Sequence, residues 1–200
     1  MAAGSTLIIW FFSEMFFFNE GEIFYAYSKI PDFSAFMLYI IEFLVVFLLF
    51  YGLFTLWLLI PIHLFRVRSI WALFLAGALC GWAIEGILPI MYAEMPLALL
   101  WPAGSWHILI DVILGWYLLR KLLEKNNHIL TLIVFAALGL FWGFWGTWFW
   151  PIESAGIPGD FTAPLTLAEF AFYTFFSTSL LSVGYFILDR FAGLSFNPTK

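Results

Sequence analysis

The chain has 200 residues, 64% of them hydrophobic and 10% charged, with a formal net charge of −5 and a mean hydropathy of +1.00. Soluble domains have about 25% charged residues, and one of this size still exposes about 30% of the surface of its unfolded chain, so this composition excludes a soluble globular fold. The single cysteine excludes an internal disulfide and a cysteine-based metal cage, and no basic tract or glycine-rich phosphate loop indicates nucleic acid or a nucleotide as a partner.

The apolar runs predict about six membrane-spanning helices. A span needs about 20 apolar residues, and such runs follow one another here with short connections. In chain order, the predicted helices lie near residues 5–27, 33–60, 69–92, 102–124, 128–151 and 163–189. The sequence therefore predicts an all-α integral membrane protein in which residues 1–200 form a single transmembrane domain.

The basic residues predict the orientation of these helices. Most of them lie in the second and fourth connections and after the last helix: Arg66, Arg68, Arg120, Lys121, Lys125, Arg190 and Lys200. The other three connections hold one base and several acids: Lys29, Asp32, Glu94, Glu153 and Asp160. Because basic connections stay in the cytoplasm, we expect both termini to be cytoplasmic and the three proline-containing loops to face outward.

Prolines and glycines recur along the chain and predict an internal repeat. Four residues recur at an offset of 62 positions: Pro89, Pro96, Pro102 and Gly81 match Pro151, Pro158, Pro164 and Gly143. At an offset of 65, the first third matches the second: Pro31, Tyr27 and Glu20-Gly21 match Pro96, Tyr92 and Glu85-Gly86. We expect three helical hairpins, near residues 1–66, 67–127 and 128–200. The alternative is that prolines coincide by chance at helix ends.

The repeat places ionisable residues at equivalent positions. Eleven residues after the shared loop prolines lie Glu42, His107 and Glu169, and eleven residues before them lie Glu20, Glu85 and Thr147. At a helical rise of about 1.5 Å per residue, all lie roughly 10–15 Å below the outer surface. A charged group at this depth costs at least about 2.5–3.5 kcal/mol. We therefore expect these side chains to converge on one interior site. The alternative is that the carboxyl groups lie at the membrane interface or form hydrogen bonds that hold helices together.

Asp111 follows His107 by four residues, so the two side chains share one face of a helix. We predict that Glu85, His107 and Asp111 are catalytic. The predicted substrate-binding residues are Glu20, Glu42, Tyr92, Trp106, Thr147, Trp148 and Glu169. A divalent metal ion is a candidate cofactor, because histidine with several carboxylates suits such ions. Its candidate ligands are Glu85, His107, Asp111 and Glu169.

Aromatic residues are dense near the end of the fifth predicted helix. Residues 141–150 read Phe-Trp-Gly-Phe-Trp-Gly-Thr-Trp-Phe-Trp. Ring faces of this kind can line a cavity for a greasy or cationic molecule. The alternative is that they pack against other helices and anchor the chain at the membrane interface.

The segment from His107 to Asp111 resembles the HxxxN/D motif of the CPBP family of intramembrane proteases. That family also carries an EExxxR motif, whereas the nearest acidic segment here, Ile84-Glu85-Gly86, has one acid and no arginine. The resemblance is confined to these short segments, and the activity of the family is not carried over.

Three classes of function fit this pattern. The first is an intramembrane enzyme, of isomerase, cyclase or hydrolase type, that acts on an isoprenoid- or lipid-like substrate by acid–base or metal-assisted chemistry. The second is a small cation- or proton-coupled transporter or channel. The third is a non-catalytic subunit of a membrane complex. The expected partners are membrane lipids, a lipophilic substrate or a cation, and further copies of the chain or other subunits, but no nucleic acid.

Overall fold

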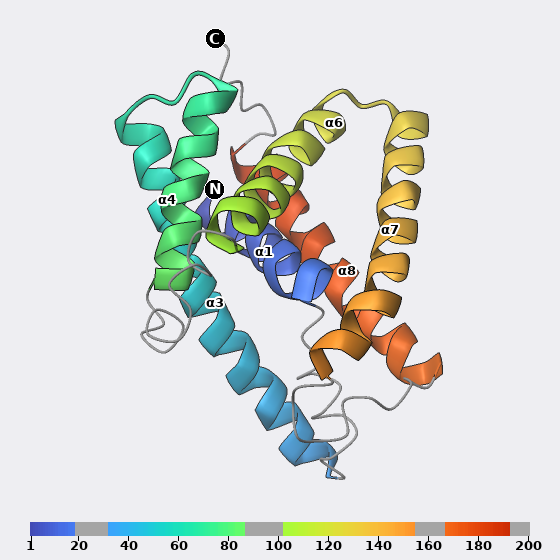
Figure 1. Cartoon of the computed structure of the whole chain (residues 1–200). Coiled ribbons are helices and arrows are strands. Elements are labelled where there is room, and N and C mark those ends of the chain that lie inside the picture. The colour runs from blue at the N-terminus through green and yellow to red at the C-terminus, as the bar shows by residue number, and fades with distance from the viewer. Residues whose placement is uncertain (19–31, 87–101, 155–166, 193–200) are drawn as a thin grey trace.

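The computed structural model describes residues 1–18, 32–86, 102–154 and 167–192 (Figure 1). Within those residues every element is a helix and no strand occurs, which confirms the all-α prediction. The elements are α1 (Ala2–Trp10), η1 (Phe11–Phe18), α3 (Phe33–Leu64), α4 (Ile70–Gly86), η2 (Pro102–Leu119), α6 (Arg120–Glu124), α7 (His128–Ser154) and α8 (Leu167–Ala192). The elements η1 and η2 are π-helices, a wider form with hydrogen bonds from residue i to i+5.

Polar residues fix where three of the helices begin. Asp32 Oδ2 accepts a hydrogen bond from the Ala35 amide at 3.0 Å before α3. In the same way, Ser69 Oγ accepts from Ala72 N at 3.1 Å and Asn127 Oδ1 from Leu130 N at 3.0 Å. Each cap satisfies an amide that has no partner within its own helix. These starts agree with those predicted at residues 33, 69 and 128.

Two tight turns gather at one end of the bundle. Arg66 and Asn126 adopt left-handed backbone conformations, with φ of 49° and 50°, and close the turns that follow α3 and α6. Figure 1 shows both turns at its upper edge, on the side toward which the C-terminal end of α8 also points. The basic residues of the second and fourth connections are therefore collected at the same end of the molecule.

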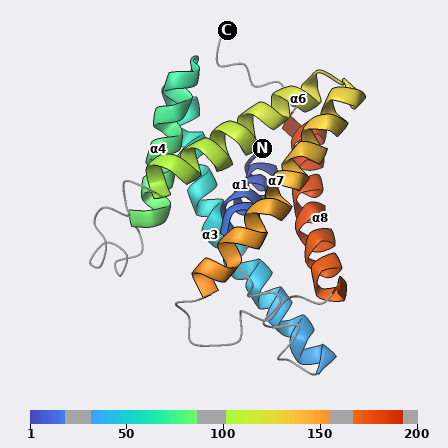
Figure 2. The ribbon, with the colours of Figure 1, turned by 45° about the vertical axis from the view of Figure 1, so that its right-hand side comes forward.

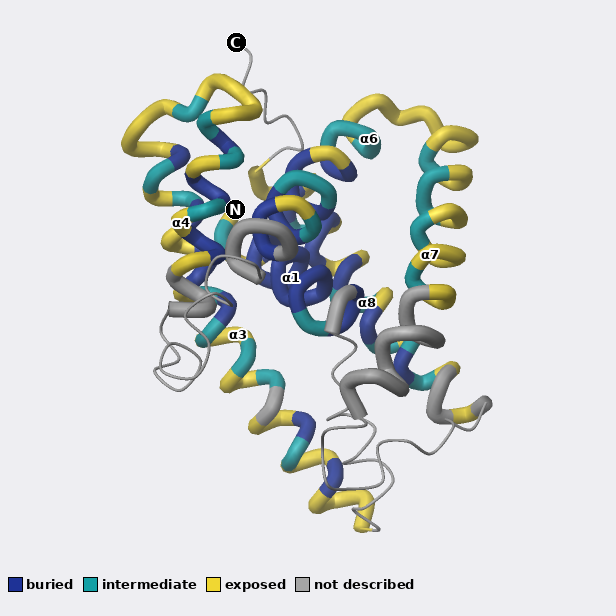
Figure 3. Tube along the Cα trace, in the orientation of Figure 1, coloured by how far each residue is buried: buried dark blue, intermediate teal, exposed yellow. Residues whose placement is uncertain are grey.

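The continuous rod of α1 and η1 occupies the centre of the fold. Seven consecutive residues of α1, from Gly4 to Trp10, are buried, as expected for a helix that is apolar on all sides (Figure 3). The helices α3, α8 and η2 pack around α1, while η2, α7 and α8 contact η1 (Figure 2). The N-terminal segment is thus the core helix of the bundle, and its residues 4–13 are buried against other helices.

Glycines allow the closest helix contacts of this core. A Cβ atom added at Gly4 would lie 2.7 Å from the backbone oxygen of Gly184, so the backbones of α1 and α8 touch. A Cβ atom at Gly115 would lie 2.2 Å from the ring of Phe12, so only a glycine lets that ring pack against η2. Small residues serve the same purpose in membrane helix pairs, where close backbone approach strengthens packing.

The outer surface of the bundle is apolar. Large side chains on α3, α7 and α8 are exposed, among them Leu49, Leu140 and Phe191 at 71%, 77% and 76%. Within the described residues, Phe33–Leu64 and Ala171–Ala192 are long and apolar enough to cross a membrane, whereas the apolar helices Ala2–Phe16, Ile70–Trp82 and His128–Phe144 are shorter. Since soluble monomers rarely expose large apolar patches, these features support a membrane protein.

Candidate acid–base site

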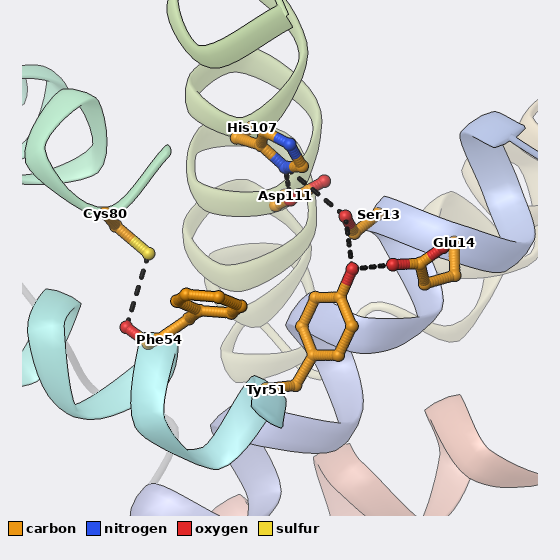
Figure 4. A network of polar contacts seen from close by, with 7 residues as sticks. All are labelled: Ser13, Glu14, Tyr51, Phe54, Cys80, His107 and Asp111. Atoms are coloured by element: carbon orange, nitrogen blue, oxygen red, sulfur yellow. Dashed lines mark hydrogen bonds and ion pairs between the residues drawn. The ribbon is translucent and has the colours of Figure 1, made fainter. Parts of the chain in front are cut away.

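His107 and Asp111 form a buried pair on η2. Asp111 Oδ2 lies 2.7 Å from His107 Nδ1, and the two residues are 1% and 3% exposed (Figure 4). The sequence placed them on one helix face, and the structure brings their side chains into direct contact. Two of the three predicted catalytic residues therefore meet in the interior of the bundle.

The contact with Asp111 determines which nitrogen of His107 can do chemistry. An ionised carboxylate only accepts hydrogen bonds, so the proton shared with Asp111 belongs to Nδ1. The tautomer is assigned from this contact, and it leaves the lone pair on Nε2. Asp111 thereby orients the ring and stabilises the imidazolium that forms when Nε2 takes up a proton. The pair has the arrangement of a general base with its orienting carboxylate.

Ser13 and Tyr51 continue the polar contacts beyond the pair. Ser13 Oγ lies 3.3 Å from His107 Nδ1, and Tyr51 Oη lies 3.0 Å from Ser13 Oγ. The hydroxyl of Tyr51 also donates a hydrogen bond to Glu14 Oε1. The result is a chain of five polar side chains from η2, η1 and α3 (Figure 4). We call this chain, made of Asp111, His107, Ser13, Tyr51 and Glu14, the polar chain.

The geometry of the polar chain excludes one obvious interpretation. Serine, histidine and aspartate are all present, but the contacts of Ser13 and Asp111 both fall on the same nitrogen, Nδ1. In a catalytic triad the serine contacts one ring nitrogen and the aspartate the other. With its proton shared with Asp111, Nδ1 cannot also act as the base for Ser13. We therefore do not assign Ser13 as a nucleophile.

Aromatic residues of α7 and α8 hold η1 beside the polar chain. The Met15 carbonyl accepts hydrogen bonds from Trp142 Nε1 at 3.0 Å and from Tyr173 Oη at 2.9 Å. The rings of Phe16 and Trp142 are stacked, with centroids 6.1 Å apart. Met15 directly follows Ser13 and Glu14 in the sequence, so these bonds help to position both. At Trp142, the aromatic run serves packing and anchoring.

The structure describes the side chain of only one of the remaining predicted site residues, Glu42. Glu42 is exposed on α3, because the buried stripe of that helix runs through Ile40, Tyr51 and Phe54 and passes Glu42 by. For five predicted residues the structure describes the backbone but not the side chain: Glu85, Trp106, Thr147, Trp148 and Glu169. Two others, Glu20 and Tyr92, lie outside the described residues. The convergence of the acids with His107 stays a prediction.

Two of the four predicted metal ligands lie in contact with each other. His107 and Asp111 adjoin, whereas the side chains of Glu85 and Glu169 lie outside the description. Within the described side chains, no group of three or more histidines, cysteines, aspartates or glutamates could hold a metal ion. The pair by itself is suited to proton transfer, and the metal ion stays a prediction.

Ser13, Glu14 and Tyr51 are not among the site residues predicted from the sequence. One signal was present: Ser13 and Glu14 are adjacent polar residues inside the apolar run of the first helix. Polar residues within an apolar helix need hydrogen-bond partners where they are removed from water. Tyr51 offers no such signal, because tyrosine is common in apolar helices.

Comparison of the chain with protein-family models, with curated proteins and with solved structures finds no match.

Proposed function

We propose that this protein is an intramembrane enzyme in which His107, oriented by Asp111, transfers a proton to or from a lipophilic substrate. The observation that carries this proposal is the buried contact of 2.7 Å between His107 Nδ1 and Asp111 Oδ2. A buried histidine with an orienting carboxylate is suited to proton transfer. Burying such a pair at low dielectric is costly, so ionisable residues inside a membrane protein commonly mark a functional site. Isomerisation, cyclisation and hydration each need such a transfer.

The class of substrate follows from the surroundings of the pair. The helices around it present an apolar exterior, with large hydrophobic side chains exposed on α3, α7 and α8. A molecule that reaches the interior from this side arrives through hydrocarbon, so an isoprenoid- or lipid-like substrate fits best. Positioned acid–base groups accelerate reactions by about 10² to 10⁴-fold.

We further propose six spans in three hairpins, with both termini in the cytoplasm. The collection of the α3–α4 and α6–α7 turns at one end of the bundle supports this topology, because those turns carry Arg66, Arg68 and Lys125. The long α3 and α8 supply two of the candidate spans. The internal repeat rests on the sequence spacing alone.

The topology predicts which positions a membrane-impermeant thiol reagent can reach. In a Cys80→Ala background, single cysteines at Ser28, Glu94 and Gly156 should react with reagent added outside intact cells. Cysteines at Ser69 and Asn126, in the basic turns, should react only after the membrane is opened. The opposite pattern of labelling would overturn the proposed orientation. Cys80 is the one native thiol, so its replacement removes any background labelling by the reagent. It is buried and donates a hydrogen bond to the Phe54 carbonyl.

A second candidate is a proton-coupled transporter. The observation that favours it is the polar chain, since a continuous series of hydrogen-bonded groups can carry protons whether or not a substrate is converted. The two candidates differ in their products: an enzyme yields a chemically altered lipid, whereas a transporter yields an unaltered solute on the other side of the membrane.

The deciding experiment compares lipid extracts of cells with and without the protein by mass spectrometry. A lipid that changes with the wild-type protein, and no longer changes with His107→Ala, supports the enzyme. The matched control is His63→Ala, because His63 is exposed near the end of α3 and should leave the lipid profile of the wild type intact. An unchanged lipid profile together with proton-coupled uptake in proteoliposomes would establish the transporter instead.

A further inference from the structure

One face of α3 combines a broad apolar surface with a single carboxyl group. The first half of this helix is mostly exposed (Figure 3), and its exposed apolar side chains include Met37, Leu38, Ile41, Val45, Val46 and Leu49. Glu42 is the one acidic residue of α3, and it is exposed among them. In a membrane such a face contacts either lipid chains or another helix, and the carboxyl group favours one of the two.

Glu42 lies within the hydrocarbon and not at its edge. It follows Phe33, the first residue of α3, by nine positions, which corresponds to about 14 Å at a rise of about 1.5 Å per residue. If Glu42 lay at the membrane surface, the apolar segment before it would project into water with the side chains of Phe33 and Leu38 exposed. Because water disfavours contact with apolar surface, the membrane surface lies nearer to the start of the helix.

A carboxyl group at this depth needs a partner. Lipid chains neither donate nor accept hydrogen bonds, so ionisable residues inside membranes almost always pair with other groups. Glu42 makes no hydrogen bond or ion pair with the part of the chain that the structure describes. The described lysines and arginines lie toward the end of the bundle opposite the start of α3: Arg66, Arg68, Arg120, Lys121, Lys125 and Arg190. A partner for Glu42 therefore has to come from another molecule.

We propose that this face of α3, centred on Glu42, docks a transmembrane helix of another protein that carries a lysine or arginine near the middle of the membrane. Charge complementarity determines the choice of partner. A second copy of the chain offers no described lysine or arginine at this depth, whereas a basic residue on another helix supplies both the opposite charge and hydrogen-bond donors. The apolar side chains around Glu42 give that helix a surface to pack against. The proposal is independent of the chemistry at His107.

The test measures the binding of synthetic transmembrane peptides to the full-length protein in lipid nanodiscs. The probe is a helix of about 20 leucine and alanine residues, long enough to span the hydrocarbon, with one lysine at its centre. That lysine lies roughly 15 Å from either membrane surface, whichever way the peptide inserts. Fluorescence energy transfer between labelled protein and labelled peptide reports association. A peptide without lysine, and one with lysine at its end, should bind about tenfold more weakly, as expected for the loss of one interhelical hydrogen bond.

Variants of the protein locate the binding on α3. Glu42→Gln should weaken binding of the central-lysine peptide by about tenfold, and Glu42→Leu by at least as much. Because Glu42 is exposed, both variants should keep the Tm of the wild type. Asp189→Asn, which removes an exposed carboxyl group near the end of α8, is the control and should bind the peptide as the wild type does.

Two results would overturn the proposal. The first is equal binding of the three peptides to the wild type, or unchanged binding of the central-lysine peptide in Glu42→Gln. The second is energy transfer between differently labelled copies of the protein that disappears in Glu42→Gln, since it would assign this face of α3 to a second copy of the chain.

Discussion

Asp111→Asn is expected to lower the turnover of the lipophilic substrate by about 10² to 10⁴-fold, the range by which positioned acid–base groups accelerate reactions. Asparagine preserves the size of the side chain but has no negative charge with which to stabilise the imidazolium. Its amide can also donate to Nδ1, which would place the lone pair on the wrong nitrogen. The measurement is product formation by purified protein in nanodiscs, with His107→Ala expected to show a loss of similar size.

The control for this change is Asp189→Asn, because Asp189 is exposed on α8 and takes no part in the polar chain. Its turnover should match that of the wild type. The loss in Asp111→Asn should appear in kcat rather than in KM, since the carboxylate acts on the charge that forms during the reaction and not on the bound lipid. Equal turnover in Asp111→Asn and wild type would remove Asp111 from the mechanism.

Gly4→Ala is expected to destabilise the bundle by about 1–3 kcal/mol, the usual cost of overpacking a well-packed core. The added methyl group would lie 2.7 Å from the Gly184 oxygen and 2.9 Å from Leu188 Cγ, so α1 and α8 must separate. A backbone oxygen cannot rotate away as a flexible side chain can. The measurement is the Tm of the purified protein in detergent, followed by tryptophan fluorescence.

Gly139→Ala provides the matched control. Gly139 lies within α7, and a Cβ atom there would meet nothing within 4 Å. Because alanine forms helices better than glycine by about 1 kcal/mol, this substitution should leave the Tm unchanged or raise it. The two glycine replacements are thus expected to act in opposite directions. Equal shifts in Tm would contradict the close packing of α1 on α8.

Much of the helical architecture follows from the sequence by simple physics. Asp32, Ser69 and Asn127 each precede a long apolar run, and a polar side chain at that place caps the first turn of a helix. The contact between His107 and Asp111 follows from their spacing, because residues four apart meet on a helix surface. Local rules of this kind need no knowledge of how the helices pack.

The rest of the site depends on packing that the sequence does not display. The contact of Ser13 with His107 depends on the packing of η1 against η2, where Gly115 leaves room for the ring of Phe12. Tyr51 reaches Ser13 because that face of α3 turns inward. Equal spacing from a proline predicts how deep a residue lies in the membrane, but it does not predict on which face of the helix its side chain lies. The spacing therefore could not reveal that Glu42 is exposed. The π-helical form of η1 and η2 has no signature in composition.

The measurement that tests the central claim most directly is the incorporation of solvent deuterium into lipid. Purified protein in nanodiscs containing a total membrane lipid extract is incubated in deuterated water, and the lipids are analysed by mass spectrometry. Any reaction in which His107 delivers a solvent-derived proton to carbon leaves deuterium in the product. The account predicts a labelled lipid with the wild type and with His63→Ala, and none with His107→Ala. Identical labelling in wild type, His107→Ala and empty nanodiscs would contradict an acid–base site at His107.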